Sequence, residues 1–250
     1  MYKRFIVTEK MSMMMKNKMS TLEVIISGLF ILTTVCTPYK TVKDIDGNVY
    51  NTVTVGGQVW LKENLRTTRF NDGTPIPNVT DITEWRHHDA PTYVWYDNDI
   101  KYKDTYGALY NWHAVGDRND LCPAGWHVPT DDEWKELEMF LGMTRAEADG
   151  TVWRGTDQGG KIKEAGTAHW DEPNKGATNE SGLTVIGTGR RFTSGLFGTM
   201  RQGCTIWSST QSSQSSACYR HFASGNERIG RNPAGEKKFG FAVRCVKNKQ

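Results

Sequence analysis

The compact motifs that mark many common enzymes are missing from this sequence. It has no Gly-x-Ser-x-Gly, His-Glu-x-x-His, P-loop or Gly-rich dinucleotide motif, which argues against the corresponding hydrolases, zinc proteases and nucleotide-binding enzymes. No apolar run reaches 18 residues, which excludes a multi-span membrane protein. No internal repeat is present, and 250 residues suit one domain of ordinary size or two small ones.

Most of the chain lacks an excess of either positive or negative side chains, although the whole sequence has a formal net charge of +3. Residues 1–36 contain five Lys or Arg and two Glu, so the rest carries 26 cationic and 26 acidic side chains. This neutral remainder gives no case for nucleic-acid binding. Aromatic residues make up 11% of the chain, and that content argues against intrinsic disorder.

The first 36 residues have the layout of an export signal. Five cations precede an apolar run at residues 24–35, and Cys36 follows at once. A membrane-spanning helix needs about 20 apolar residues, so this run is too short to be one. Cys36 resembles the lipidation site of a bacterial lipoprotein, although Val35 stands where a small residue is usual. We therefore predict lipidation at Cys36, with cleavage of a plain signal near Thr37 or an uncleaved anchor as alternatives.

Four cysteines follow the export segment: Cys122, Cys204, Cys218 and Cys245. An even count in an exported chain favours disulfides, and four cysteines allow three pairings. Cys204 and Cys218 flank a polar Ser/Gln stretch typical of a hairpin tip, which favours a bridge between them and a second bridge from Cys122 to Cys245. Each would stabilise the fold by about 3–5 kcal/mol. A zinc site is the competing interpretation, but no Cys-x-x-Cys pair occurs.

Local patterns predict a short polar lead at residues 37–48 and one domain over residues 49–250. Alternating residues around Gly56 predict a hairpin over residues 49–61. Apolar spacing predicts a helix at residues 106–115. A capping box formed by Thr130 and Glu133 predicts a second helix that runs to about Leu141 and stops at Gly142. A Gly-rich excursion follows, and residues 205–209, 217–223 and 239–246 read as closing strands.

Six blocks of the sequence resemble the Fibrobacter succinogenes major paralogous domain, a family common in exported proteins and lipoproteins of Bacteroidetes. They are TVTVGGQVWLKENLRTTRFNDGTPIP (52–77), YGALYNWHAV (106–115), LCPAGWHVPTDDEW (121–134), GATNESGL (176–183), IWSST (206–210) and FGFAVRCVKN (239–248). The resemblance covers about residues 50–248. It implies an α+β domain of the C-type-lectin-like superfamily, with two helices, small antiparallel sheets and long Gly-rich loops.

The lectin resemblance draws attention to a possible calcium site. Calcium-dependent lectins use a Glu-Pro-Asn triplet with a cis proline, and residues 172–174 carry this triplet. Hard oxygen ligands suit Ca²⁺. The predicted ligands are Glu172, Asn174, Asn179 and Glu180. No Trp-Asn-Asp follows to complete a lectin site, so a solvated polar loop is the alternative, and no other cofactor is expected.

The stretch 201–231 has the composition of a recognition surface, because aromatic residues and Arg alternate with small polar ones. The predicted ligand-binding residues are Arg201, Trp207, Tyr219, Arg220, His221, Asn226, Arg228 and Arg231. In lectin-like folds the loops before the last strand carry ligands. The alternative is that every second residue here belongs to a strand core, Trp207 in particular.

These observations favour a non-catalytic recognition domain that binds a glycan or a surface protein. Its expected location is the outer membrane or cell surface, held by a lipid anchor at Cys36, or otherwise the periplasm or the medium. A structural or fimbria-associated module without a small ligand is the second hypothesis. The third is an oxidase of the formylglycine-generating type, because residues 106–134 also resemble those enzymes. They need a reactive Cys pair and copper, whereas the cysteines here are assigned to structural bridges.

Overall fold

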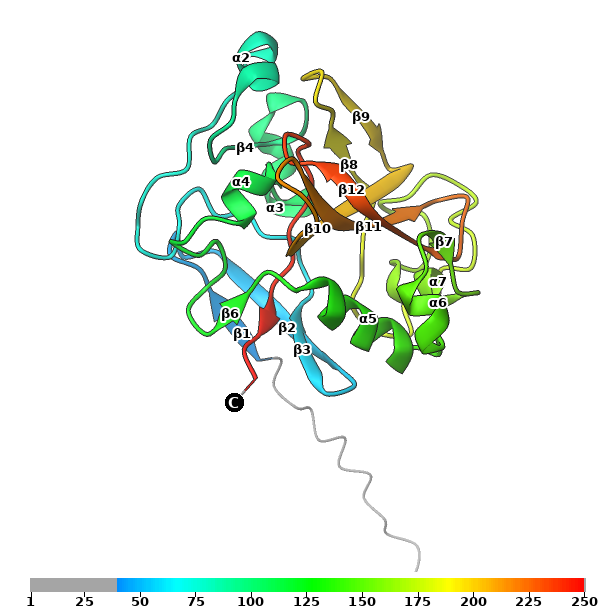
Figure 1. Cartoon of the computed structure of the whole chain (residues 1–250). Helices are drawn as coiled ribbons and strands as arrows, with labels where there is room; N and C mark the ends of the chain where they lie inside the picture. Colours follow the sequence, from blue (N-terminus) through cyan, green and yellow to red (C-terminus); the bar gives the residue numbers. More distant parts are fainter. Residues whose placement is uncertain (1–39, 250) are drawn as a thin grey trace, which may run out of the picture. The chain divides into compact units, whose positions relative to one another are not determined.

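The computed structural model describes residues 40–249, coloured along the chain in Figure 1. The predicted export segment and Cys36 lie outside the described residues. No helix between residues 40 and 249 is long and apolar enough to cross a membrane. The described part contains both helices and sheets, and so has the α+β architecture that the sequence predicts.

A five-stranded sheet brings together the first and last strands of the described chain (Figure 1). Its order is β1 (Thr41–Lys43), β2 (Val49–Val55), β3 (Gln58–Leu61), β13 (Val246–Lys247) and β6 (Trp126–His127), all antiparallel. The predicted hairpin over residues 49–61 is confirmed, and Gly56 turns it with φ of +59°. The polar lead supplies β1, which the sequence did not reveal.

A six-stranded sheet forms the second layer. Its order is β7 (Val152–Arg154), β12 (Ile229–Glu236), β11 (Ser216–Ala223), β10 (Gly203–Gln211), β8 (Thr188–Arg191) and β9 (Phe197–Met200). Strands β10 and β8 run parallel, and the other pairs are antiparallel. The predicted strands at 205–209 and 217–223 are thus confirmed. Of residues 239–246 only Val246 joins a strand, because the segment crosses between elements through single bridges such as Tyr110–Phe241.

The predicted helix at residues 106–115 is wrong. Leu109–Tyr110 forms β5, which pairs with β4 (Tyr93–Val94), and only Trp112–Val115 is helical, as α4. The Tyr110 hydroxyl donates to the carbonyl of Thr67 at 2.6 Å, and Asn111 caps α4 by accepting from the amide of Ala114. Tertiary pairing therefore overrides the helical spacing of the apolar residues.

Helix α5 (Asp131–Phe140) begins at the predicted capping box, with Thr130 and Glu133 bonded to each other's backbone amides. It ends before Gly142, which has φ of +113°. Trp134 on α5 contacts both sheets, because its ring lies 4.8 Å from Trp60 of β3 and 6.5 Å from Phe222 of β11. The described chain has more helices than the two predicted. The additional ones are α2 (Ile82–His87), α3 (Lys103–Tyr106), α6 (Arg145–Asp149), α7 (Gln158–Ile162) and the 3-10 turns Tyr96–Asn98 and Ile100–Tyr102.

One of the two predicted disulfides is present. Cys122 and Cys245 are bonded, whereas Cys204 and Cys218 are buried free thiols. The predicted Cys204–Cys218 bridge is wrong because of strand register. Cys204 pairs with Phe222 across the sheet, four residues along β11 from Cys218. Four strand residues span about 13 Å, whereas bridged cysteines need Cα atoms within about 7 Å.

Candidate functional site

The two faces of strand β11 have different environments, because successive side chains of a strand point to opposite sides. Arg220 and Phe222 are fully buried on the face toward α5. Tyr219 and His221 are only half-buried on the other face. The sheet therefore separates a closed interior face from a partly open one, and the sequence-predicted binding residues divide between them.

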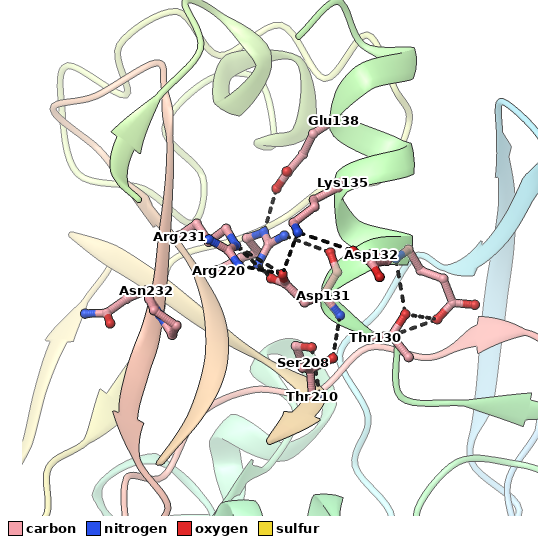
Figure 2. A network of polar contacts seen from close by, with 12 residues as sticks. Thr130, Asp131, Asp132, Lys135, Glu138, Ser208, Thr210, Arg220, Arg231 and Asn232 are labelled. Carbon is pink, nitrogen blue, oxygen red and sulfur yellow. Dashed lines mark hydrogen bonds and ion pairs between the residues drawn. The ribbon is translucent and has the colours of Figure 1, made fainter. Parts of the chain in front are cut away.

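On the interior face Arg220 forms two ion pairs with α5. Its Nε lies 2.6 Å from Oε1 of Glu138, and its Nη1 lies 2.7 Å from Oδ1 of Asp131, as Figure 2 shows. Glu138 also accepts from Arg154 at 2.8 Å. These contacts correct the prediction for Arg220, because a fully buried, paired guanidinium is unavailable to a surface ligand.

Arg231 and Lys135 complete this buried charge cluster. Asp131 accepts from Nη2 of Arg231 at 2.7 Å and lies 3.2 Å from Nζ of Lys135, which also reaches Asp149 at 3.0 Å. Burial alone would raise the pKa of Asp131. Hydrogen bonds from Arg231 and the positive charge of Arg220 outweigh it and hold that pKa well below its usual value. These ion pairs join α5 to strands β7, β11 and β12 of the sheet.

On the other face of the sheet lies a shallow pocket. It has a volume of about 320 Å³ and is lined by Val152, Trp153, Arg190, Tyr219, His221, Gly230, Arg231 and Asn232. These residues come from β7, β8, β11 and β12, four strands of the six-stranded sheet (Figure 1). The volume lies at the lower end of the usual range for small-molecule sites.

Contacts among the lining residues hold the aromatic rings in place. The rings of Trp153 and His221 have centroids 5.2 Å apart, and Asn232 donates to the Tyr219 hydroxyl at 3.1 Å. Gly230 pairs with both His221 and Trp153. A Cβ at Gly230 would lie 3.1 Å from Cβ of His221, so a side chain there would crowd the rings.

Arg190 supplies the charge of this pocket. Its Nε lies 3.4 Å from Oγ1 of Thr199 and its guanidinium sits 5.6 Å from the ring centroid of Phe192, but no carboxylate between residues 40 and 249 forms an ion pair with it. Burial lowers the pKa of His221 to about 4, and the nearby charge of Arg190 adds to that effect, so the imidazole is neutral at pH 7. Arg231 is neutralised by Asp131. The pocket therefore carries one uncompensated positive charge.

Val152 marks the rim of the pocket with an unusual backbone. Its φ is +61°, and 69% of its side chain surface is exposed. A β-branched residue in the left-handed region is strained by about 1–2 kcal/mol. Such strain gathers at functional sites, where the surrounding structure holds it in place.

The Fibrobacter succinogenes major domain matches residues 53–247 of the chain, which include all the pocket residues. The chain belongs to this family. No curated protein and no solved structure matches the chain. The family assignment thus rests on most of the described chain, and the pocket is described from this member of the Fibrobacter succinogenes major domain family alone.

The structure brings some of the predicted ligand residues together and separates others. Tyr219, His221 and Arg231 line the pocket. Trp207 is fully buried and its indole N–H donates to the carbonyl of Tyr110 at 2.9 Å, so it belongs to the core. Five members of the pocket were missed: Val152, Trp153, Arg190 and Asn232 lie outside the stretch 201–231, and Gly230 lies inside it but has no side chain that composition would single out.

The remaining three predicted residues lie away from the pocket lining. Arg201 pairs with Asp171 at 3.0 Å and donates to carbonyls of the loop at residues 167–170. Asn226 and Arg228 belong to the turn between β11 and β12, where the Asn226 side chain accepts from the Arg228 amide. In this member of the Fibrobacter succinogenes major domain family, the predicted residues that line the pocket are Tyr219 and His221 from the middle of the stretch and Arg231 at its end.

Two of the predicted calcium ligands make loop contacts and two are exposed, while the Oδ1 atom of Asn174 is buried and has no hydrogen-bond partner among residues 40–249. Asn174 is buried and donates to the carbonyls of Glu164 and Gly166, and Asn179 exchanges hydrogen bonds with Thr184. Glu172 and Glu180 are exposed, and the Glu172–Pro173 peptide is cis. Among residues 40–249 no group of three or more His, Cys, Asp or Glu is arranged to hold a metal ion. Calcium binding here stays a prediction.

In a second cavity of the domain, of about 220 Å³, key polar groups already have partners. Glu164 pairs with His169 at 2.8 Å, and Arg244 donates to Asn64, to the Leu183 carbonyl and to the Thr184 carbonyl. The pocket at Arg190 differs because its cation has no such set of partners, which makes it the better candidate for a ligand site.

Proposed function

We propose that this domain is a non-catalytic recognition module that binds a glycan in the pocket formed by β7, β8, β11 and β12. The observation that carries the proposal is the meeting of Trp153, Tyr219 and His221 with the polar side chains of Arg190 and Asn232. Ligand sites typically combine apolar and aromatic walls with a few placed polar groups. A pyranose ring has the same character, with apolar C–H faces and a polar rim.

The placement of these side chains on strands supports rigid recognition. Trp153, Tyr219 and His221 stand on paired strands, and the buried charge cluster fixes the same strands to α5 from the other side. Sites built on regular elements hold their geometry better than sites on loops. A preformed site of this kind loses little conformational freedom on binding, which favours affinity from a small contact area.

The chemistry of the pocket supports binding without catalysis. Hydrolysis of a glycosidic bond ordinarily uses two carboxyl groups that flank it, and none of the eight lining residues is Asp or Glu. The two free thiols are also poor candidates for an oxidase. Burial raises the pKa of Cys204 and of Cys218, which disfavours the reactive thiolate, and strand register keeps them apart.

The lectin-like fold and the surface location belong to the same proposal. The meeting of the terminal strands in one sheet and the long loop between α7 and β8 support a C-type-lectin-like arrangement. The apolar run followed by Cys36 supports export and a lipid anchor. Mass spectrometry of the mature N-terminus from membranes would detect acyl chains on Cys36, and an unmodified start at Thr37 would contradict the anchor.

Glycan-array binding followed by calorimetry tests the recognition function. Trp153→Ala removes the largest aromatic surface of the pocket, and we expect it to weaken glycan binding at least tenfold. Arg228→Ala is the matched control, because Arg228 is exposed in the adjacent turn and does not line the pocket. Equal binding by wild type and Trp153→Ala, with both proteins folded, would contradict the proposal.

A further inference from the structure

The arginines of the six-stranded sheet differ in burial and in how their N–H groups are satisfied. A guanidinium has five donors, and buried donors without acceptors are destabilising. Arg191 donates to the carbonyls of Gly195, Val79 and Thr80 at 3.0, 2.6 and 2.9 Å. Arg220 meets two carboxylates, as described above. Arg190 is only half-buried, and among residues 40–249 its one hydrogen bond is the 3.4 Å contact from Nε to Thr199, so its terminal N–H groups are open to solvent or to a ligand.

The surroundings of Arg190 indicate what that acceptor is. The side chain lies in the pocket with Tyr219 and His221, and its charge influences the titration of His221. Neither of these neighbours carries a carboxylate. A planar guanidinium fork matches a carboxylate in size and shape and binds it through two parallel hydrogen bonds. An oxyanion brought by a ligand would therefore fit this guanidinium.

The rest of the pocket restricts the ligand further. Trp153 presents a large apolar ring that suits one face of a sugar, while Asn232 and Tyr219 form a polar pair that suits ring hydroxyls. A simple inorganic anion would use Arg190 but none of these groups. A sugar ring that carries a carboxylate would use all of them.

We propose that the pocket selects acidic sugars, in which a uronic acid residue packs on Trp153 and its carboxylate pairs with Arg190. This inference rests on the proposed glycan-binding function and adds the charge of the ligand to it. Arg190 acts as the specificity residue, and Trp153 supplies affinity for acidic and neutral sugars alike.

Methyl esters give a matched probe, because esterification removes the carboxylate charge and keeps the ring. Galacturonate, glucuronate and mannuronate oligosaccharides are each titrated beside their methyl esters into the folded protein by calorimetry. We expect at least one acid to bind ten or more times tighter than its ester at low salt. That preference should shrink as salt is added, because added ions screen the charge pair.

Arg190→Met keeps most of the side-chain volume and removes the charge. It should lower affinity for the acid about tenfold, to the level of the ester, and leave ester binding unchanged. Arg228→Met is the control and should keep the preference. If acid and ester bind equally to wild type, the inference is wrong while glycan recognition stands. If no member of any pair binds while the glycan array finds another sugar, the inference is wrong and glycan recognition stands; if the array also finds none, both fail. If Arg190→Met does not fold, the comparison of acid and ester binding by the wild-type protein still tests the inference.

Discussion

The two faces of the six-stranded sheet use arginine in opposite ways. On the face toward α5, Arg220 lies between Glu138 and Asp131 in a cluster of buried ion pairs. On the open face, Arg190 lies among aromatic rings without a carboxylate partner in the described part of the chain. Residue type alone therefore does not identify a binding arginine. The balance of nearby charge and the remaining hydrogen-bonding capacity distinguish a structural guanidinium from one prepared for a ligand.

We expect the largest change in the free energy of unfolding from Arg220→Met, on the buried face of the sheet. Removing one partner of a buried ion pair leaves Glu138 and Asp131 partly unpaired, which destabilises a protein by about 3–5 kcal/mol. Urea unfolding at pH 7 measures the change in the free energy of unfolding. A loss below about 1 kcal/mol would show that the buried cluster contributes little to stability.

His221, on the open face of the sheet, should make the free energy of unfolding depend on pH. The folded pKa is about 4 against an ordinary 6.5, so between these values the unfolded chain binds more protons. Stability from this residue is full above pH 6.5 and is lost as pH falls, by about 2 kcal/mol between pH 7 and pH 5. His221→Gln should remove that part of the slope. Identical slopes in variant and wild type would contradict a neutral His221.

Val152→Gly tests strain at the pocket rim. Glycine tolerates φ of +61°, and the exposed Val152 side chain contributes little packing. We therefore expect Val152→Gly to raise the free energy of unfolding by about 0.5–1 kcal/mol, as measured by thermal unfolding. Val49→Gly is the control, because Val49 is also exposed but lies in the regular part of β2, and it should be destabilised. Destabilisation of both variants by the same amount would argue against strain at Val152.

The smallest change is expected for Arg190→Met. Arg190 has no ion pair to lose among residues 40–249, so stability should stay within about 0.5 kcal/mol of wild type in the same urea experiment. A loss as large as that of Arg220→Met would remove the contrast between the two faces, because Arg190 would then be a structural residue as well.

Features with strong local signals could be predicted from the sequence. The hairpin around Gly56 and the capping box of Thr130 and Glu133 depend on residues a few positions apart, and both formed as expected. The spacing at 106–115 is an equally local signal, but β4 captures Leu109 and Tyr110 into a strand. A local sequence pattern therefore predicts the structure only where no distant segment pairs with the same backbone.

The candidate site was only partly predictable for the same reason. Composition pointed to the stretch around Tyr219 and His221, and strand alternation indicated that half of it would be buried. Trp153 and Arg190 come from segments on either side of the long loop, and only the sheet order brings β7 and β8 to the same pocket. The failed bridge between Cys204 and Cys218 likewise depended on register, which the polar turn between them does not determine.

The bond between Cys122 and Cys245 has a mechanical consequence when the domain is pulled from its two ends. It closes a covalent loop that contains every residue of the pocket, from Val152 to Asn232. Tension applied between the two ends of the chain passes through the sulfur atoms and bypasses that loop. A pull can therefore lengthen the chain before Cys122 and after Cys245, while a single protease cut inside the loop releases no fragment until the bond is reduced.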